Sequence, residues 1–123
     1  MENSLTNSSL SQQVLGNSAP TLTGDKSLSV QEGETAVGDL VAMDVNGDSI
    51  SFFLAGEDAA YFTLSLYGRL SFVSAADFEN PLDNNKDNIY KIRVRVSDGI
   101  DSITYDLTVE VLEPIRNNNF QTG

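Results

Sequence analysis

The residues of this sequence that could do chemistry are carboxylates and amides, because the chain contains neither histidine nor cysteine. A Ser–His dyad, a thiol nucleophile and a thiolate or imidazole metal site are therefore excluded. The 123 residues include 18 acidic and 7 basic side chains, and the formal net charge is −11. Such a surface repels phosphate, which argues against nucleic acid and against an anionic membrane as partners. The longest apolar runs are only a few residues, so we expect no membrane insertion. Carboxylate oxygens bind hard cations, so the chemistry we expect is binding of Ca²⁺.

The acidic residues gather where strands are expected to end rather than along exposed faces. Like charges at one end of a fold repel, and a bound Ca²⁺, with about six to eight oxygen ligands, would remove that cost. A self-contained EF-hand loop needs glycine at its sixth position and an acid at its twelfth. A loop beginning at Asp44 has Ser49 and Ala55 there, and one beginning at Asp83 fails likewise. Any site must be assembled from separate segments, with candidates at Glu32, Asp44, Asn46, Asp48, Asp77, Glu79 and Asp98.

Alternating apolar residues predict strands throughout the segment that would position these acids. Seven short runs, separated by Gly, Asn, Asp and Pro turn signals, are typical of a β-sandwich. The runs are residues 27–30, 37–43, 50–54, 62–66, 70–73, 89–96 and 103–111. We therefore expect an all-β domain over residues 21–113. The Asn/Ser-rich residues 1–20 and residues 114–123 are expected to be disordered tails or linkers.

The last two runs predict a specific hairpin register. With residues 98–101 as the turn, Arg93 lies opposite Asp106 on the outer face. All the alternating apolar residues of 103–111 then face the core. The same register pairs, on the core side, Val96 with Ile103, Val94 with Tyr105 and Ile92 with Leu107.

Several motifs in order resemble a cadherin repeat, in particular the cadherin-like repeats of bacterial surface proteins. The resemblance covers about Asn17 to Glu113, and five motifs carry it. They are Ser29-Val30-Gln31-Glu32 for "V-x-E", Ala42-Met43-Asp44-Val45-Asn46-Gly47 for "A-x-D-x-D-x-G", Tyr61-Phe62-Thr63-Leu64 with Tyr67-Gly68-Arg69-Leu70 for "F-x-I…T-G-x-L", Asp77-Phe78-Glu79 for "D-x-E", and residues 90–99 for "Y-x-L-x-V-x-A-x-D-G". Asn17-Ser18-Ala19-Pro20 resembles the end of the linker motif "D-x-N-D-N-x-P".

The resemblance implies a seven-stranded Greek-key β-sandwich with calcium held at the junctions between consecutive repeats. At the junction with the following repeat it implies the ligands Glu32, Asp77 and Glu79. At the junction with the preceding repeat it implies Asp44, Asn46 and Asp98, helped by Asn17.

The chain departs from the family pattern in both junctions. Asn46 stands where the family has a second Asp, which removes one ligand charge. In the C-terminal linker Arg116 stands where a carboxylate belongs, so only Glu113 could serve there. The long segment 80–88 could supply Asp83 or Asp87 as a local ligand, or could be a solvated loop.

The same residues also have plainer interpretations. Acids at turns accept backbone N–H groups, and Asn-Gly suits a turn with positive φ. Paired catalytic carboxylates at Asp77 and Glu79 are not expected, since a small sandwich without Trp has little surface to grip a sugar. We therefore do not expect an enzyme.

We expect a calcium-binding cadherin-like module of an extracellular or cell-surface protein. It would act in adhesion or as a calcium-stiffened spacer between neighbouring repeats of the same polypeptide, with a like domain or a polysaccharide on an opposing surface as a further partner. The alternative is a non-catalytic carbohydrate-binding module. In that module the basic stripe over residues 91–95 and an exposed Tyr61 or Tyr67 would contact the sugar.

Overall fold

A computed structural model describes residues 17–114 of the chain and has almost only β-structure there. Short polar turns divide the apolar runs into strands, and one 3₁₀ turn, η2 (Ala59–Tyr61), interrupts them. No helix in this part of the chain is long and apolar enough to cross a bilayer. The strands are β1 (Thr21–Thr23), β2 (Ser27–Gln31), β3 (Ala36–Asp39), β4 (Val41–Met43), β5 (Ser51–Ala55), β6 (Phe62–Leu64), β7 (Arg69–Phe72), β8 (Ile89–Ser97) and β9 (Ser102–Leu112).

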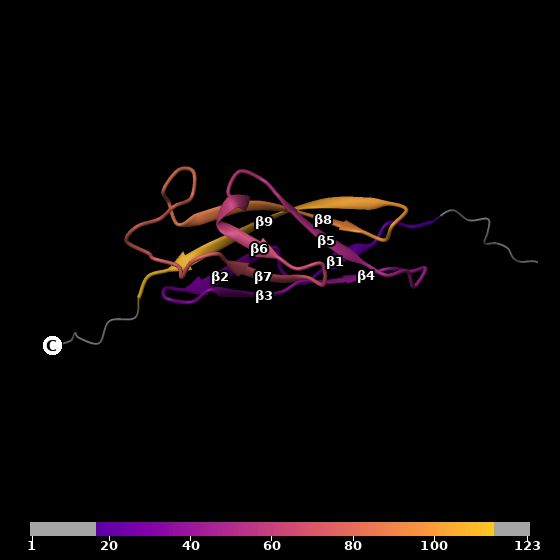
Figure 1. Cartoon of the computed structure of the whole chain (residues 1–123), viewed down its shortest axis with the longest axis horizontal. Coiled ribbons are helices and arrows are strands. Elements are labelled where there is room, and N and C mark those ends of the chain that lie inside the picture. Colours follow the sequence, from indigo (N-terminus) through magenta and orange to yellow (C-terminus); the bar gives the residue numbers. More distant parts are fainter. Residues whose placement is uncertain (1–16, 115–123) are drawn as a thin grey trace, which may run out of the picture.

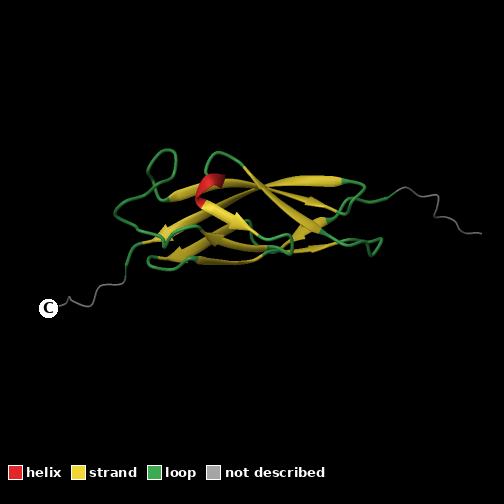
Figure 2. Ribbon diagram, in the orientation of Figure 1, coloured by secondary structure: helices red, strands yellow, loops and turns green. Residues whose placement is uncertain are grey.

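The strands form the two layers of a β-sandwich (Figures 1 and 2). One layer is a four-stranded sheet in the order β2-β9-β8-β5, in which β2 runs parallel to β9. The other holds the three-stranded sheet β3-β7-β6 and the pair β1-β4, and only Leu40 separates β3 from β4. Strands adjacent in space are mostly not adjacent in sequence, as a Greek-key sandwich requires. The expected all-β sandwich is therefore confirmed.

The strand count agrees with the expected seven when interrupted strands are joined. β3 and β4 together make the single run expected at residues 37–43. β1 and β2 together make the first strand. Its first segment pairs with β4 in one layer, and its second segment lies beside β9 in the other. The sequence analysis placed only the second segment of this strand. β1 has a single apolar residue, the buried Leu22 between two threonines, and one residue cannot make an alternating pattern.

The inward residues of β8 and β9 make the centre of the core. Strand pairing follows the expected register, with Val96 opposite Ile103 and Arg93 opposite Asp106. Ile103 is nevertheless 41% exposed, so its expected place in the core is wrong. β2 pairs with β9 only from Thr108 onward, which leaves β9 as an edge strand at Ile103. Buried on these two strands are Tyr90, Ile92, Val94, Val96, Leu107, Val109 and Val111.

The β6–β7 hairpin is held tightly against the start of β4. Gly68 in its turn has φ +101°, a conformation that favours glycine. The Leu40 N–H donates to the Gly68 carbonyl oxygen at 2.7 Å. A Cβ on Gly68 would lie 2.5 Å from the Leu40 carbonyl oxygen, so no other side chain fits without movement.

Candidate metal centre

Three carboxylates meet at the end of the sandwich where the described chain begins. β4 and β8 both end there, so the β4–β5 loop carries Asp44 and Asp48 to the same place as Asp98 in the β8–β9 turn (right-hand end of Figure 1). One oxygen from each of these carboxylates lies within 4.8 Å of the other two. We call Asp44, Asp48 and Asp98 the acidic cluster; it is the one group of three or more potential metal ligands found within residues 17–114.

Asp98 is the fixed member of the acidic cluster. Its Oδ1 accepts the N–H groups of Ile100 and Asp101, each at 2.8 Å. Its Oδ2 accepts a hydrogen bond from Nδ2 of Asn17 at 2.6 Å. The same nitrogen also donates to Oδ2 of Asp101 at 3.0 Å. The Asn17 amide is the largest cause that lowers the pKa of Asp98 to about 2, followed by the Asp101 N–H. Asp98 is therefore a carboxylate at any physiological pH.

Asp44 is the member of the acidic cluster that has an unsatisfied buried oxygen, within residues 17–114. Its Oδ1 accepts the N–H of Asn46 at 2.8 Å. Its Oδ2 is buried and has no hydrogen-bond partner among the described residues. Burial raises the pKa of Asp44, and the neighbouring carboxylates of Asp98 and Asp48 raise it further. A cation placed beside an oxygen that is removed from water and faces like charges would stabilise its charged form.

The turn between Asp44 and Asp48 brings their carboxylates together. The Gly47 N–H donates to the Asp44 carbonyl oxygen at 3.0 Å, which closes the chain into a turn. Asn46 Oδ1 accepts the Ser18 N–H at 3.0 Å, so this amide holds the entering chain. The sequence analysis named Asp48 among the candidate ligands, but the family resemblance implied only Asp44, Asn46 and Asp98 at this end. The sequence feature that could have added Asp48 to this set is its position just after the Asn-Gly turn that follows Asp44.

The other predicted ligands lie near the opposite end, where β2 and β9 finish. The Glu32 carboxylate accepts the Phe78 N–H at 3.0 Å, which ties the β2–β3 turn to the segment after β7. Asp77 accepts the Glu79 N–H at 3.2 Å and Nδ2 of Asn80 at 2.9 Å. These carboxylates cap backbone N–H groups, and no set of three acids at this end has oxygens as close together as the acidic cluster, within the described part of the chain.

Glu113 lies beside the same end, just after β9. Its carbonyl oxygen accepts Nε2 of Gln31 at 3.4 Å, and Gln31 is the residue before Glu32. Arg116, which stands where the family has a carboxylate, lies outside the described residues.

Two buried carboxylates have a structural role that the sequence did not indicate. Asp58 is 1% exposed, and it accepts the N–H groups of Asn84 and Lys91 at 2.8 and 2.7 Å. Asp83 is fully buried, and both of its oxygens accept backbone N–H groups from its own loop, at 2.9 and 3.0 Å. The interpretation of this loop as merely solvated is therefore wrong at Asp83, because its carboxylate supplies the hydrogen bonds that shape the loop.

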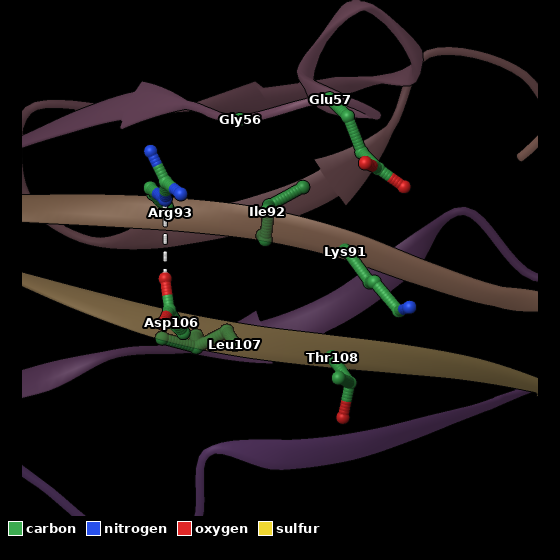
Figure 3. A pocket seen from close by; sticks show the side chains of 8 residues that line it. All are labelled: Gly56, Glu57, Lys91, Ile92, Arg93, Asp106, Leu107 and Thr108. Atoms are coloured by element: carbon green, nitrogen blue, oxygen red, sulfur yellow. Dashed lines mark hydrogen bonds and ion pairs between the residues drawn. The ribbon is translucent and has the colours of Figure 1, made fainter. Parts of the chain in front are cut away.

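The outward face of β8 carries the basic stripe named in the alternative hypothesis. A hollow of about 540 Å³ lies there between the chain after β5 and the faces of β8 and β9 (Figure 3). Arg93 pairs with Asp106 across it at 3.2 Å, and Glu57 adds another acid to its lining. Arg95 stacks over the Phe53 ring at 4.3 Å. Charges of both signs line this surface, so it is not a stripe reserved for an anionic ligand.

Comparisons with known proteins found a matching family model and similar solved structures. A family model described as bacterial Ig domain matches residues 17–110. No curated protein sequence matches the chain. A human protocadherin-24 EC1-2 structure covers 80% of this chain at 23% identity with a TM-score of 0.68. A Drosophila N-cadherin EC1-3 structure covers 79% at 21% identity with a TM-score of 0.65. The match takes in 45% and 35% of those chains, respectively.

At these identities the likeness to cadherin ectodomains shows the fold alone. The family model, in contrast, matches most of the chain, from Asn17, which donates a hydrogen bond to Asp98, to Glu110 near the end of β9. The chain therefore belongs to the bacterial Ig domain family, and it has the β-sandwich fold of cadherin ectodomain repeats.

Proposed function

We propose that this domain is a calcium-binding repeat module of an extracellular or cell-surface protein. The observation that carries the proposal is the acidic cluster with its buried carboxylate oxygen Asp44 Oδ2, which has no hydrogen-bond partner within residues 17–114. The donor set fits Ca²⁺, which prefers carboxylate, carbonyl and water oxygens. Proteins in these families are generally non-catalytic, and we propose no reaction.

The chain's own residues explain how cation binding would stiffen a junction. Asp98 holds Asn17 and Asn46 holds Ser18, so the residues that enter the domain are tied to the two loops that carry the acidic cluster. Without a cation, repulsion among the three carboxylates opposes the close approach of these two loops. A bound Ca²⁺ supplies the positive charge that cancels this repulsion. Fixing both loops then fixes the direction in which the preceding part of the polypeptide enters.

The opposite end would contribute to the junction with a following repeat. Glu32, Asp77, Glu79 and Glu113 lie on segments that converge there, and the first two segments are already joined by a hydrogen bond. Since their carboxylates are not gathered as closely as the acidic cluster, we propose that this end needs ligands from the next repeat. The module would thus act as a spacer or adhesion element between neighbouring repeats of the same polypeptide. The basic face gives no comparable support to carbohydrate binding.

A calcium titration followed by amide NMR shifts tests this function. We expect saturable shifts at residues 44–48 and 98–101, with a Kd on the order of 10⁻⁴ to 10⁻³ M, as for extracellular modules. The variant Asp44→Asn should lose them. Asp39→Asn is the matched control, because this exposed acid pairs with Arg69 away from the acidic cluster. Shifts that never saturate, or that spread over exposed acids without preference for these loops, would refute the proposal.

A further inference from the structure

We propose that Asn46 is a site of spontaneous deamidation, and that its conversion to aspartate places a further carboxylate beside the acidic cluster. In the whole sequence, Asn46 is the only asparagine that precedes a glycine. Asn46 and Gly47 are both exposed and lie in the loop between β4 and β5. The conversion itself is independent of calcium, and only its consequence for cation binding rests on the proposed function.

The reaction needs no reagent but water. The Gly47 main-chain nitrogen attacks Cγ of Asn46, and an N–C bond forms. The bond from Cγ to Nδ2 breaks, and ammonia leaves with the proton given up by the Gly47 nitrogen. A five-membered succinimide remains. Water then opens this ring at either of its two carbonyl carbons, which gives aspartate or isoaspartate at position 46.

Gly47 provides an unhindered nucleophile. It has φ +76°, and an added Cβ would meet no atom within 4 Å apart from its own chain neighbours, so the space beside its Cα is open. The Gly47 N–H does donate to the Asp44 carbonyl oxygen at 3.0 Å, and this bond must open first. A single hydrogen bond in an exposed turn contributes little net stability and opens frequently.

The Asn46 amide is also activated by its own hydrogen bond. Its Oδ1 accepts the Ser18 N–H at 3.0 Å. Negative charge develops on this same oxygen when the Gly47 nitrogen adds to Cγ. A backbone N–H aimed at such an oxygen stabilises the tetrahedral intermediate, as an oxyanion-hole donor does. The contact that ties the entering chain to the loop therefore also favours the reaction.

Other asparagines in the described chain provide internal controls. Asn80 precedes Pro81, whose nitrogen carries no hydrogen and cannot form the succinimide in this way. Asn88 precedes the branched Ile89, and its Nδ2 donates to the Phe78 carbonyl oxygen at 2.8 Å. Asn84 is exposed like Asn46 but is followed by a residue with a side chain. Only Asn46 combines exposure with a following glycine.

The two products would affect the cation site in opposite directions. Aspartate at position 46 adds one negative charge on the loop that carries Asp44 and Asp48, which favours a divalent cation. Isoaspartate inserts an extra carbon into the main chain between these two residues, and so alters the spacing that brings their carboxylates together. The newly made chain would carry an amide at position 46, and its affinity for the cation would change as this amide is converted.

Peptide mapping by mass spectrometry, after incubation of the whole chain at mildly alkaline pH, tests the conversion. We expect Asn46 to convert several-fold faster than Asn84, with no conversion at Asn80. Asn46→Gln should remove the early acidic form from the charge profile. The proposal is overturned if Asn46 keeps its amide while Asn84 converts, or if the two convert at equal rates.

Calcium titration of Asn46→Asp, compared with the unaged chain and with Asn46→Gln, tests the consequence. We expect the aspartate variant to bind calcium several-fold more tightly than both. Equal affinities in all three overturn the consequence. If none of the three binds calcium while Asn46 still converts, the proposed function fails and the modification stands.

Discussion

Replacing Asp48 by asparagine should have opposite effects on stability in chelator and in calcium. One carboxylate oxygen of Asp48 lies within 4.8 Å of an oxygen of both Asp44 and Asp98. Within residues 17–114, no hydrogen bond or ion pair holds the Asp48 side chain. Without a cation, its charge adds to the repulsion that raises the pKa of Asp44. Asp48→Asn removes that repulsion, so we expect the variant to be more stable than the parent chain in chelator. In calcium it should gain less, because a ligand charge is gone.

The magnitude follows from linkage between binding and folding. With a Kd of about 0.1–1 mM for the parent chain, ~10 mM calcium stabilises the folded state by about 1.4–2.7 kcal/mol. For a domain of this size that corresponds to a rise in melting temperature of roughly 6–20 °C. Loss of one ligand charge that weakens binding about tenfold would reduce the gain to about 0.4–1.4 kcal/mol.

Thermal unfolding in chelator and in calcium, on both proteins, measures these differences. Asp106→Asn is the control, since Asp106 lies on the outer face of β9 and pairs there with Arg93. It should respond to calcium as the parent chain does. The reasoning is refuted if Asp48→Asn is less stable than the parent chain in chelator, or if calcium raises both melting temperatures equally.

Three further predictions follow from the hydrogen bonds and close contacts of the fold. Gly68→Ala should destabilise the domain by about 1–3 kcal/mol in denaturant unfolding, because φ is +101° there and the new Cβ would strike the Leu40 carbonyl oxygen. Asp58→Ala should cost on the order of 3 kcal/mol in the same assay, since two backbone N–H groups lose their buried acceptor. Asn17→Ala should raise the pKa of Asp98 from about 2 toward its ordinary value of 3.8, as read from a carboxyl NMR titration. The lowered pKa stabilises the fold above pH ~4, and this contribution is lost as pH falls through about 2. In Asn17→Ala the contribution should be smaller, and its loss should be complete at a higher pH.

Each of these has a matched comparison. Gly33→Ala also alters a glycine with positive φ, but there the Cβ has open space, so it should cost less than Gly68→Ala. Asp39→Asn removes an exposed acid and should change stability by no more than about 1 kcal/mol, in contrast to Asp58→Ala. An Asp98 pKa that does not move in Asn17→Ala would show that the backbone donors, and not the Asn17 amide, hold it low.

The sandwich and its central hairpin follow from residue patterns alone. A period of two over residues 89–96 and 103–111 allows one register that keeps both apolar sets on the same face, and the pairing of Val96 with Ile103 follows it. The same pattern predicted that the acids lie at strand ends. Strand ends are local features, and they depend on turn residues that are read directly from the chain.

Which of those acids meet depends instead on how the two layers pack. The acidic cluster joins two loops about 50 residues apart, and the position of each loop depends on how the layers pack rather than on any local pattern. For the same reason the sequence did not distinguish Asp48, which joins the cluster, from Asp83, whose burial turns a polar loop residue into a structural acceptor. Local chemistry names the residues that can bind a cation, but the distances between segments determine which of them share one.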